Sequence, residues 1–419
     1  GENNVAMGWK ALNANTTAAN NVAVGACALL TNTTGASNTA VGTNALCTNT
    51  VGACNVAVGF DALKVATCGK NTAVGGRNME ATTTGECNAS FGYATLISNT
   101  TGGNNSAFGY APMNANTTGS NNSAFGYCSL AANTTGVSNV AVGFESLKAN
   151  TTGANNAAVG KSSMSSNTTG SDNVAIGCGS LCINTTGAQN VAIGHFSLDA
   201  NTTASNNVAV GYCSLTTNTT GTPNTAVGQG SLRQNTTGAN NVALGFESLK
   251  NNTTGASNTA VGKDALFTNT TGCQNVAVGW TSLLDNTTGK FNVALSRALI
   301  NNTTGGSNTS IGYDSMQCNT TGCTNVAIGD STLFTNTASD NVAVGATALY
   351  SNTTGTQNVA VGRRALVANT TANDNTAVGF DSLKANTTGC QNVAVGTFAL
   401  FANTDAFKNV AVGFEAGKD

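Results

Sequence analysis

The stretch SNVAVGFESLKANTTGANNAAVG, residues 138–160, contains the same phrase twice, first as Asn139-Val-Ala-Val-Gly and then as Asn156-Ala-Ala-Val-Gly. The phrase consists of asparagine, a small or β-branched residue, alanine or serine, an apolar residue and glycine. It begins at Asn4 and recurs until Asn409, 25 times in all, at a spacing of 17 residues with three exceptions. A fixed period of this length indicates a repeat architecture in which neighbouring repeats stack.

Each repeat is called a coil, and its residues are numbered in columns 1 to 17 from the asparagine that opens the phrase. Columns 12 to 15 hold a second phrase, Asn-Thr-Thr-Gly, in complete or altered form 24 times. Three coils are one residue short and begin at Asn55, Asn292 and Asn325; the second carries Ser296 in place of the usual glycine. Because no linker interrupts the repeats, we expect residues 1–419 to form one continuous array and part of a longer fibre.

The apolar columns predict an all-β fold, a parallel β-solenoid of about 25 coils. Column 4 is apolar in every coil, column 2 is mostly valine or threonine, column 3 is alanine or serine, and column 9 is almost always leucine or methionine. We expect these columns to form the core. Glycine at column 5 and the Asn-Thr-Thr-Gly phrase predict two bends that separate two short strands. One coil buries too little apolar surface to fold alone, so the coils must stack.

Composition excludes several other classes of protein. Charged residues make up 8% of the chain and the net charge is −2, so no basic surface for nucleic acid is expected. The 50 glycines occur with only 2 prolines, which excludes collagen. No apolar run approaches the roughly 18 residues that a membrane-spanning helix requires, and we expect no membrane insertion in this segment. Hydrophobic residues make up 40% of the chain and fall in fixed columns, which argues against disorder.

Side chains that could support catalysis are scarce. The single histidine, His195, lies in column 6, which varies from coil to coil. A zinc site needs clustered cysteine and histidine, and the closest approaches, Cys178 with Cys182 and Cys318 with Cys323, have no second pair nearby. The sequence therefore predicts no catalytic residue, no metal site and no cofactor, and a protein that is not an enzyme.

The thirteen cysteines raise the question of disulfides. Cysteines in the same column of adjacent coils would lie within disulfide distance, but no two adjacent coils have such a pair. The remaining candidates are Cys54 with Cys68, Cys318 with Cys323, links between chains, or free thiols buried as small apolar groups. Because thirteen is odd, one chain cannot pair all of its cysteines with each other.

Two kinds of side chain stand out in the variable columns. Column 6 carries aromatic residues, which either form a receptor-binding surface or pack between copies of the chain, and we favour packing. In four coils an acidic residue at column 7 is followed three residues later by lysine, as in Glu145 and Lys148, and we expect solvent-exposed ion pairs. The column 6 aromatics include Trp9, Tyr93, Tyr110, Tyr127, Tyr212 and Trp280.

The second phrase satisfies the acceptor motif for N-glycosylation in 19 of its 24 occurrences. Either the chain carries a row of glycans, or asparagine and threonine serve only the hydrogen bonds of the turn and its ladders. Regular rows of threonine can also order water, which makes ice binding a remote alternative. The candidate asparagines are Asn15, Asn32, Asn99, Asn116, Asn133, Asn150, Asn167, Asn184, Asn201, Asn218, Asn235, Asn252, Asn269, Asn286, Asn302, Asn319, Asn352, Asn369 and Asn386.

The segment Asn207-Val-Ala-Val-Gly-Tyr-Cys-Ser-Leu resembles the head repeat of trimeric autotransporter adhesins, whose consensus is Asn-Ser-Val-Ala-Ile-Gly followed by a small-residue strand. It is also similar to the Asn-Thr-Ala-Ile-Gly arrays of bacterial surface proteins, phage tail fibres and large-virus fibre-like proteins. The resemblance covers the entire chain. It implies a left-handed parallel β-roll, three chains packed side by side, and an extracellular location on a cell or virion surface. The Asn-Thr-Thr-Gly turn departs from the family, because it makes these coils longer.

Together these observations predict a structural fibre or stalk, a homotrimer that could also join end to end in a filament. The alternative is an adhesive module in which the variable columns bind a surface glycan or another receptor.

Overall fold

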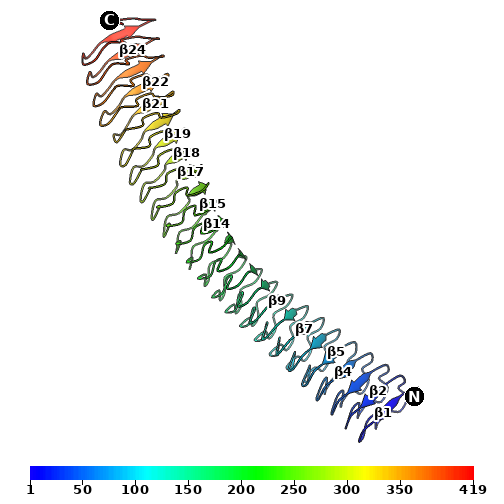
Figure 1. The fold of residues 1–419 in the computed structure, drawn as a ribbon. Coiled ribbons are helices and arrows are strands. Elements are labelled where there is room, and N and C mark those ends of the chain that lie inside the picture. The colour runs from blue at the N-terminus through cyan, green and yellow to red at the C-terminus, as the bar shows by residue number, and fades with distance from the viewer. The chain divides into compact units, whose positions relative to one another are not determined.

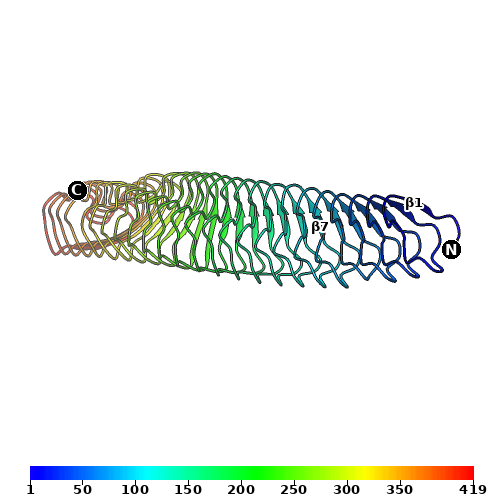
Figure 2. The same cartoon turned by 90° about the horizontal axis from the view of Figure 1, so that it is seen from below.

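The computed structural model describes residues 1–419 as two compact units, Gly1–Asn207 and Val208–Asp419. Each unit contains strands and turns and no helix. A membrane-spanning helix is therefore absent from residues 1–419. Within each unit the strands are parallel and consecutive strands pair, so each unit is a stack of coils (Figures 1 and 2). The predicted all-β solenoid is confirmed.

Each coil contributes one short strand. The strands of the first unit are β1 (Val5–Met7), β2 (Val22–Val24), β3 (Thr39–Val41), β4 (Val56–Val58), β5 (Thr72–Val74), β6 (Ala89–Phe91), β7 (Ser106–Phe108), β8 (Ser123–Phe125), β9 (Val140–Val142), β10 (Ala157–Val159), β11 (Val174–Ile176) and β12 (Val191–Ile193). Those of the second unit are β13 (Val208–Val210), β14 (Asn224–Val227), β15 (Asn241–Leu244), β16 (Thr259–Val261), β17 (Val276–Val278), β18 (Val293–Leu295), β19 (Thr309–Ile311), β20 (Val326–Ile328), β21 (Val342–Val344), β22 (Val359–Val361), β23 (Thr376–Val378), β24 (Val393–Val395) and β25 (Val410–Val412).

The register follows the sequence repeat. Val140 of β9 pairs with Ala157 of β10, the residue at the same column one coil later. The short coils keep the same columns aligned, as in the pairing of Val56 with Thr72, because their missing residue falls outside the strand. The coil assignment read from the sequence is therefore confirmed, including all three short coils.

The core differs from the predicted one. Ala141 at column 3 and Leu147 at column 9 are fully buried, whereas Val140 and Val142 are 40% and 37% exposed. The prediction that columns 2 and 4 lie in the core is wrong. Side chains alternate along a strand, and the narrow interior of the coil accepts only the small column 3 side chain opposite the column 9 leucine.

The second predicted strand, around column 9, is absent. Leu147 has a φ of 52°, far from the extended conformation, and the other column 9 residues from Leu29 to Leu400 share this left-handed backbone. This conformation points the leucine into the coil, and its amide donates a hydrogen bond to the next coil, at 2.9 Å from the Ser163 carbonyl. Repeated stacking therefore stabilises a backbone that an isolated coil would not hold.

Glycine at column 5 forms the predicted bend. Gly143 has a φ of 133°, and a Cβ atom there would lie 2.6 Å from the Gly160 carbonyl oxygen of the next coil. Only Ser296 replaces this glycine, with a φ of 69°. The residue missing from that coil falls between Ser296 and Leu299, so the bend there has a different shape.

Two internal asparagine ladders fill the rest of the coil. In the first, at column 1, the Asn139 Oδ1 accepts a hydrogen bond from the Asn156 backbone at 3.0 Å, and its Nδ2 donates to the Gly153 carbonyl at 2.9 Å. In the second, at column 12, the Asn150 Nδ2 donates to the Asn133 Oδ1 and to the same Gly153 carbonyl, each at 2.9 Å. Both ladders are buried. Backbone groups of the turn have no partner in a strand, and the asparagine side chains supply their hydrogen bonds instead.

Candidate functional site

The strands present an apolar outer face, defined as columns 2 and 4 of all coils. No charged residue occupies either column in any coil, and the column 4 side chains are partly or substantially exposed. Val142, Val159 and Ile176 follow one another along this face in three consecutive coils. Exposed apolar side chains that lie next to one another, as those of column 4 do, mark an interaction site. Because columns 2 and 4 were assigned to the core, reasoning from the sequence missed this surface.

Three consecutive coils carry phenylalanine on the apolar outer face. The rings of Phe91 and Phe108 stack with centroids 4.9 Å apart, and those of Phe108 and Phe125 stack at 4.8 Å. In these coils column 2 is small, with Ala89, Ser106 and Ser123 in place of the usual valine or threonine.

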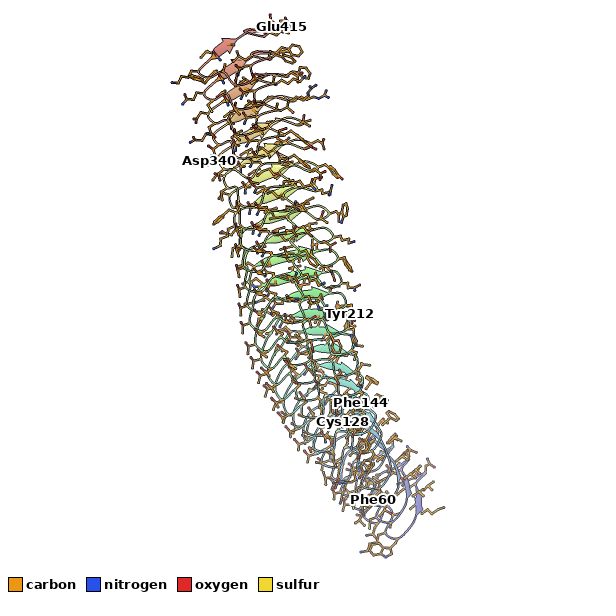
Figure 3. All side chains as sticks on the ribbon, turned by 60° about the vertical axis from the view of Figure 1, so that its left-hand side comes forward. Phe60, Cys128, Phe144, Tyr212, Asp340 and Glu415 are labelled. Atoms are coloured by element: carbon orange, nitrogen blue, oxygen red, sulfur yellow. The ribbon has the colours of Figure 1, made fainter.

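The same coils carry tyrosine at column 6. Tyr93, Tyr110 and Tyr127 are 48%, 52% and 46% exposed, with ring centroids 5.7 and 5.4 Å apart. The stack continues to Phe144 at 5.1 Å, one of the outward side chains labelled in Figure 3. We call the three phenylalanines of column 4 and the three tyrosines the aromatic block. The other predicted aromatics, Trp9, Tyr212 and Trp280, are also exposed but belong to other coils.

Ion pairs form where the sequence predicts them. Lys148 contacts Glu145 at 2.7 Å and Lys250 contacts Glu247 at 2.8 Å, and the two other predicted pairs also form. Each joins columns 7 and 10 of one coil, to one side of the apolar outer face. The two glutamate pairs are partly exposed and add little stability. In the other two pairs the aspartates, Asp61 and Asp381, are buried, so the expectation of solvent-exposed pairs is wrong for them.

The short coil that begins at Asn292 carries a distinct polar contact. Arg297 donates to Asp314 at 2.7 Å and to the Tyr313 hydroxyl at 2.8 Å. Its guanidinium also lies 5.8 Å from the Trp280 ring and 5.0 Å from the Tyr313 ring. Arg297 therefore links three consecutive coils where the glycine bend is lost.

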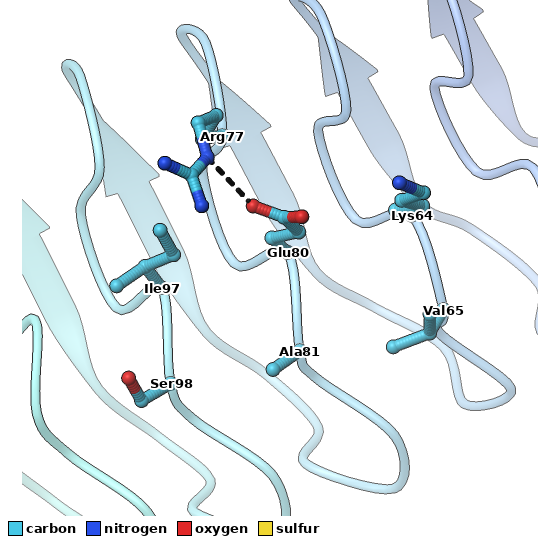
Figure 4. A pocket seen from close by; sticks show the side chains of 7 residues that line it. All are labelled: Lys64, Val65, Arg77, Glu80, Ala81, Ile97 and Ser98. Atoms are coloured by element: carbon cyan, nitrogen blue, oxygen red, sulfur yellow. Dashed lines mark hydrogen bonds and ion pairs between the residues drawn. The ribbon is translucent and has the colours of Figure 1, made fainter.

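A hollow of about 550 Å³ lies over three coils of the first unit (Figure 4). Two of these coils lack the asparagine of the second ladder, because Ala66 and Thr82 occupy column 12 there. Arg77 pairs with Glu80 at 2.9 Å, and this contact raises the pKa of the arginine. The hollow is lined by Lys64, Val65, Arg77, Glu80, Ala81, Ile97 and Ser98. The ion pair neutralises much of the charge available to a ligand.

No group of three or more histidine, cysteine, aspartate and glutamate side chains in residues 1–419 is placed to hold a metal ion. The His195 ring lies against Phe196, at 4.0 Å between centroids. Burial raises the pKa of nearby Asp199, and His195 lowers it to a smaller extent.

The candidate glycosylation sites lie inside the coils. Every asparagine of that series from Asn32 to Asn386 is fully buried, and only Asn15, in the first coil, is partly exposed. The Asn150 Nδ2, for example, donates to two acceptors, so neither of its hydrogens is available for replacement by a sugar. These eighteen buried positions therefore leave no room for a glycan in this fold, and the asparagines serve the ladder.

The two threonines of the second phrase have different surroundings. The Thr151 hydroxyl at column 13 donates to the Thr168 carbonyl of the next coil at 3.1 Å, a contact that recurs along the chain. Thr135 and the other column 14 threonines are exposed. The column 14 threonines thus reach the solvent, whereas column 13 varies from half-buried, as at Thr151, to exposed, as at Thr353.

The structure contains no disulfide, and all thirteen cysteines are free. Neither Cys54 with Cys68 nor Cys318 with Cys323 is bonded. The Cys68 thiol donates to the Gly85 carbonyl at 2.8 Å, and burial raises its pKa, so the unreactive thiol form dominates at neutral pH. Cys323 instead accepts a hydrogen bond from the Gly306 amide at 3.4 Å.

The structure thus offers an extended surface rather than a cleft as the candidate functional site. Its most distinctive part is the aromatic block in the first unit. No protein family model matches the chain, and no curated protein matches it, so the resemblance to adhesin head repeats stays a prediction.

Proposed function

We propose that this protein is a structural, fibre-forming solenoid that associates side by side with copies of itself through the apolar outer face. The observation that supports this proposal most strongly is the absence of any charged residue from columns 2 and 4 in all coils, although column 4 is accessible to solvent. Burying such a face gains about 25 cal/mol for each Å² of apolar surface removed from water.

The repeat itself favours a second copy as the partner. Successive coils of a parallel sheet lie about 4.8 Å apart, so side chains on the apolar outer face recur at that interval. A partner with the same interval can make an equivalent contact in every coil, whereas an irregular surface matches only a few. The resemblance to adhesin heads adds the expectation of three copies and of a location outside a cell or on a virion.

Three adjacent substitutions on the apolar outer face test this proposal. The variant carries Val142→Glu, Val159→Glu and Ile176→Glu, and its mass in solution is measured by light scattering. The matched control carries Thr135→Glu, Thr152→Glu and Thr169→Glu, which places the same stacked charges on the exposed column 14. Repulsion between neighbouring glutamates is then present in both variants, and only the face differs.

We expect the wild-type chain and the control to have a multiple of the chain mass of 41.5 kDa. The face variant should have the mass of one chain, with an unchanged circular dichroism spectrum. A wild-type chain that stays single at micromolar concentration would overturn the proposal.

An adhesive module is the second candidate, because the tyrosines of the aromatic block are exposed in the single chain. Replacing Tyr93, Tyr110 and Tyr127 with alanine separates the two functions. Loss of binding to a glycan array with unchanged assembly would favour adhesion, whereas no binding by the wild-type chain would exclude those glycans as ligands.

A further inference from the structure

Side-by-side packing of a repetitive face leaves one question open, the relative height of the two copies. Most coils present valine or threonine at column 2 and valine, isoleucine or leucine at column 4. A copy displaced by one coil along its neighbour would therefore meet nearly the same side chains. Register is weakly specified wherever a strand surface repeats in this way.

The aromatic block breaks this equivalence. Phenylalanine occupies column 4 in only three coils, and these three are consecutive. Their rings form one continuous stack with interplanar angles of 10° and 4°. If one copy were displaced by one coil, the phenylalanine at one end of its stack would face an ordinary column 4 residue of the neighbour. At the other end, a phenylalanine of the neighbour would face an ordinary residue in turn.

The small residues beside the phenylalanines indicate that this surface is covered. Columns 2 and 4 leave the strand on the same side. Every phenylalanine at column 4 coincides with alanine or serine at column 2, and elsewhere only Ala157 is as small. If this face were exposed to solvent, the combined side-chain volume at columns 2 and 4 could vary freely from coil to coil. A neighbouring molecule packed at a fixed distance requires that volume to stay nearly constant.

We propose that the three phenylalanines of the aromatic block fix the axial register between copies that pack through the apolar outer face. This inference rests on the proposed self-association and adds a function to the block. The ordinary coils supply the contact, and the three unusual coils select one of many similar alignments. A single distinctive position selects register in coiled coils by the same principle.

The test removes the phenylalanines of the block by restoring ordinary residues at columns 2 and 4 in the full chain, and it leaves the tyrosines at column 6 unchanged. The erased variant carries Ala89→Val, Phe91→Val, Ser106→Val, Phe108→Val, Ser123→Val and Phe125→Val. A relocated variant adds a new block of phenylalanines four coils further on, in the coils of β10, β11 and β12, where Ala157 already supplies one small column 2 residue. Its further substitutions are Val159→Phe, Val174→Ser, Ile176→Phe, Val191→Ser and Ile193→Phe.

Disulfide trapping measures the register. A chain with Val24→Cys is co-expressed with a chain that carries a cysteine at column 2 or 4 of the same coil or of the next coil. The second substitutions are Val22→Cys, Val24→Cys, Thr39→Cys and Val41→Cys, which lie outside the native and the relocated block. Cβ atoms must approach within about 4.5 Å to form the bond, a distance short enough to discriminate between adjacent coils. Peptide mapping separates these bonds from those of the native cysteines.

With the native block, bonds within the same coil level should dominate. In the erased variant the mass of the assembly should be unchanged, and the share of same-level bonds should fall about threefold if displacements of one coil in either direction become equally populated. The relocated variant should restore the preference.

An erased variant that keeps the same-level preference would overturn the register proposal, and so would an erased variant that no longer assembles. A wild-type chain that does not assemble would instead refute the self-association on which the proposal rests.

Discussion

The buried asparagines of the second ladder stabilise the coil through their side-chain hydrogen bonds, although they are polar. The Asn133 side chain donates to the Asn116 Oδ1 at 2.7 Å and to the Gly136 carbonyl at 3.0 Å, and accepts from Asn150 at 2.9 Å. Its replacement removes the hydrogen bond to the buried Asn116 Oδ1 and one of the two hydrogen bonds that the Asn150 Nδ2 donates. Each unsatisfied group costs about 1–3 kcal/mol, which exceeds the benefit of any apolar substitute.

Asn133→Ala should therefore lower the free energy of unfolding by about 2–4 kcal/mol. Urea denaturation followed by circular dichroism measures this change. The control, Thr135→Ala, lies two residues away at an exposed position and should change stability by no more than about 0.5 kcal/mol. Equal effects of the two substitutions would contradict the structural role of the ladder.

The same burial predicts that these asparagines carry no glycan. The chain produced in a cell that glycosylates secreted proteins should keep an intact mass of 41.5 kDa, apart from any sugar on the partly exposed Asn15. Mass spectrometry of the intact chain decides this point. Sugar on Asn133 or its equivalents in the folded protein would show that the ladder is not formed.

Asp285 predicts a pH dependence with a defined sign. Burial raises the pKa of this carboxyl group above its ordinary value, so its charged form destabilises the folded chain. The penalty is absent when the pH lies below the pKa of the unfolded chain, sets in as the pH rises, and is complete above the raised pKa. Asp285→Asn should raise the melting temperature at pH 7 slightly, by about one degree, and have little effect at pH 3.

Calorimetry at the two pH values measures this difference. The matched control is Asp330→Asn, because Asp330 is exposed in the same unit and its replacement should change neither value. An equal gain from Asp285→Asn at both pH values would show that charge is not the cause.

At the residue scale the sequence identified the columns but misjudged two of them. Valine is more hydrophobic than alanine, so composition alone placed Val140 and Val142 inside with Ala141. The structure reverses this order because the coil is too narrow for valine opposite Leu147. Hydrophobicity says which residues avoid water, but it does not say how much space the interior offers.

The coil is the unit of structure at the next scale. Its single strand, its glycine bend and its two ladders recur with the same partners in the coils above and below. Contacts therefore join only neighbouring coils, and stability is close to a sum over coils and their interfaces. A whole coil is consequently a removable element.

Deletion of residues 156–172, one complete coil, should leave the circular dichroism spectrum and the protease resistance of the chain nearly unchanged. Deletion of residues 156–163 removes a strand and half of its coil, which shifts every following column and should make this region sensitive to proteases. Limited proteolysis with mass mapping compares the two variants. Equal damage by both deletions would contradict the modular account.

The sequence predicted the coils but not their internal path. The period and the three short coils follow directly from the spacing of the phrases, and the pairing of Val56 with Thr72 confirms them. The second strand was expected because the residues around column 9 are apolar. Its absence reflects the left-handed backbone of residues such as Leu147, which no pattern of hydrophobicity records.

At the scale of the whole molecule, the proposed function depends on the apolar outer face. The single chain exposes a repeating apolar surface and, in its first unit, the aromatic block. Self-association would bury both and would turn a stack of coils into a fibre subunit. The two glutamate ion pairs at columns 7 and 10 lie beside this face and would remain hydrated.

The aromatic block could be found only in part from the sequence. The tyrosines were recognised because column 6 was assigned to the surface, whereas Phe91, Phe108 and Phe125 were assigned to the interior with the rest of column 4. The compensating Ala89, Ser106 and Ser123 are visible in the sequence. They gain meaning once the structure shows that columns 2 and 4 face outward together.

Cryo-electron microscopy of the purified full-length protein tests the central claim most directly, because it shows what lies against column 4. The account predicts several coil stacks side by side in each particle, with Val142, Val159 and Ile176 at the seam between copies and Thr135 facing solvent. Particles that contain a single coil stack, with column 4 in contact with water along its whole length, would contradict it.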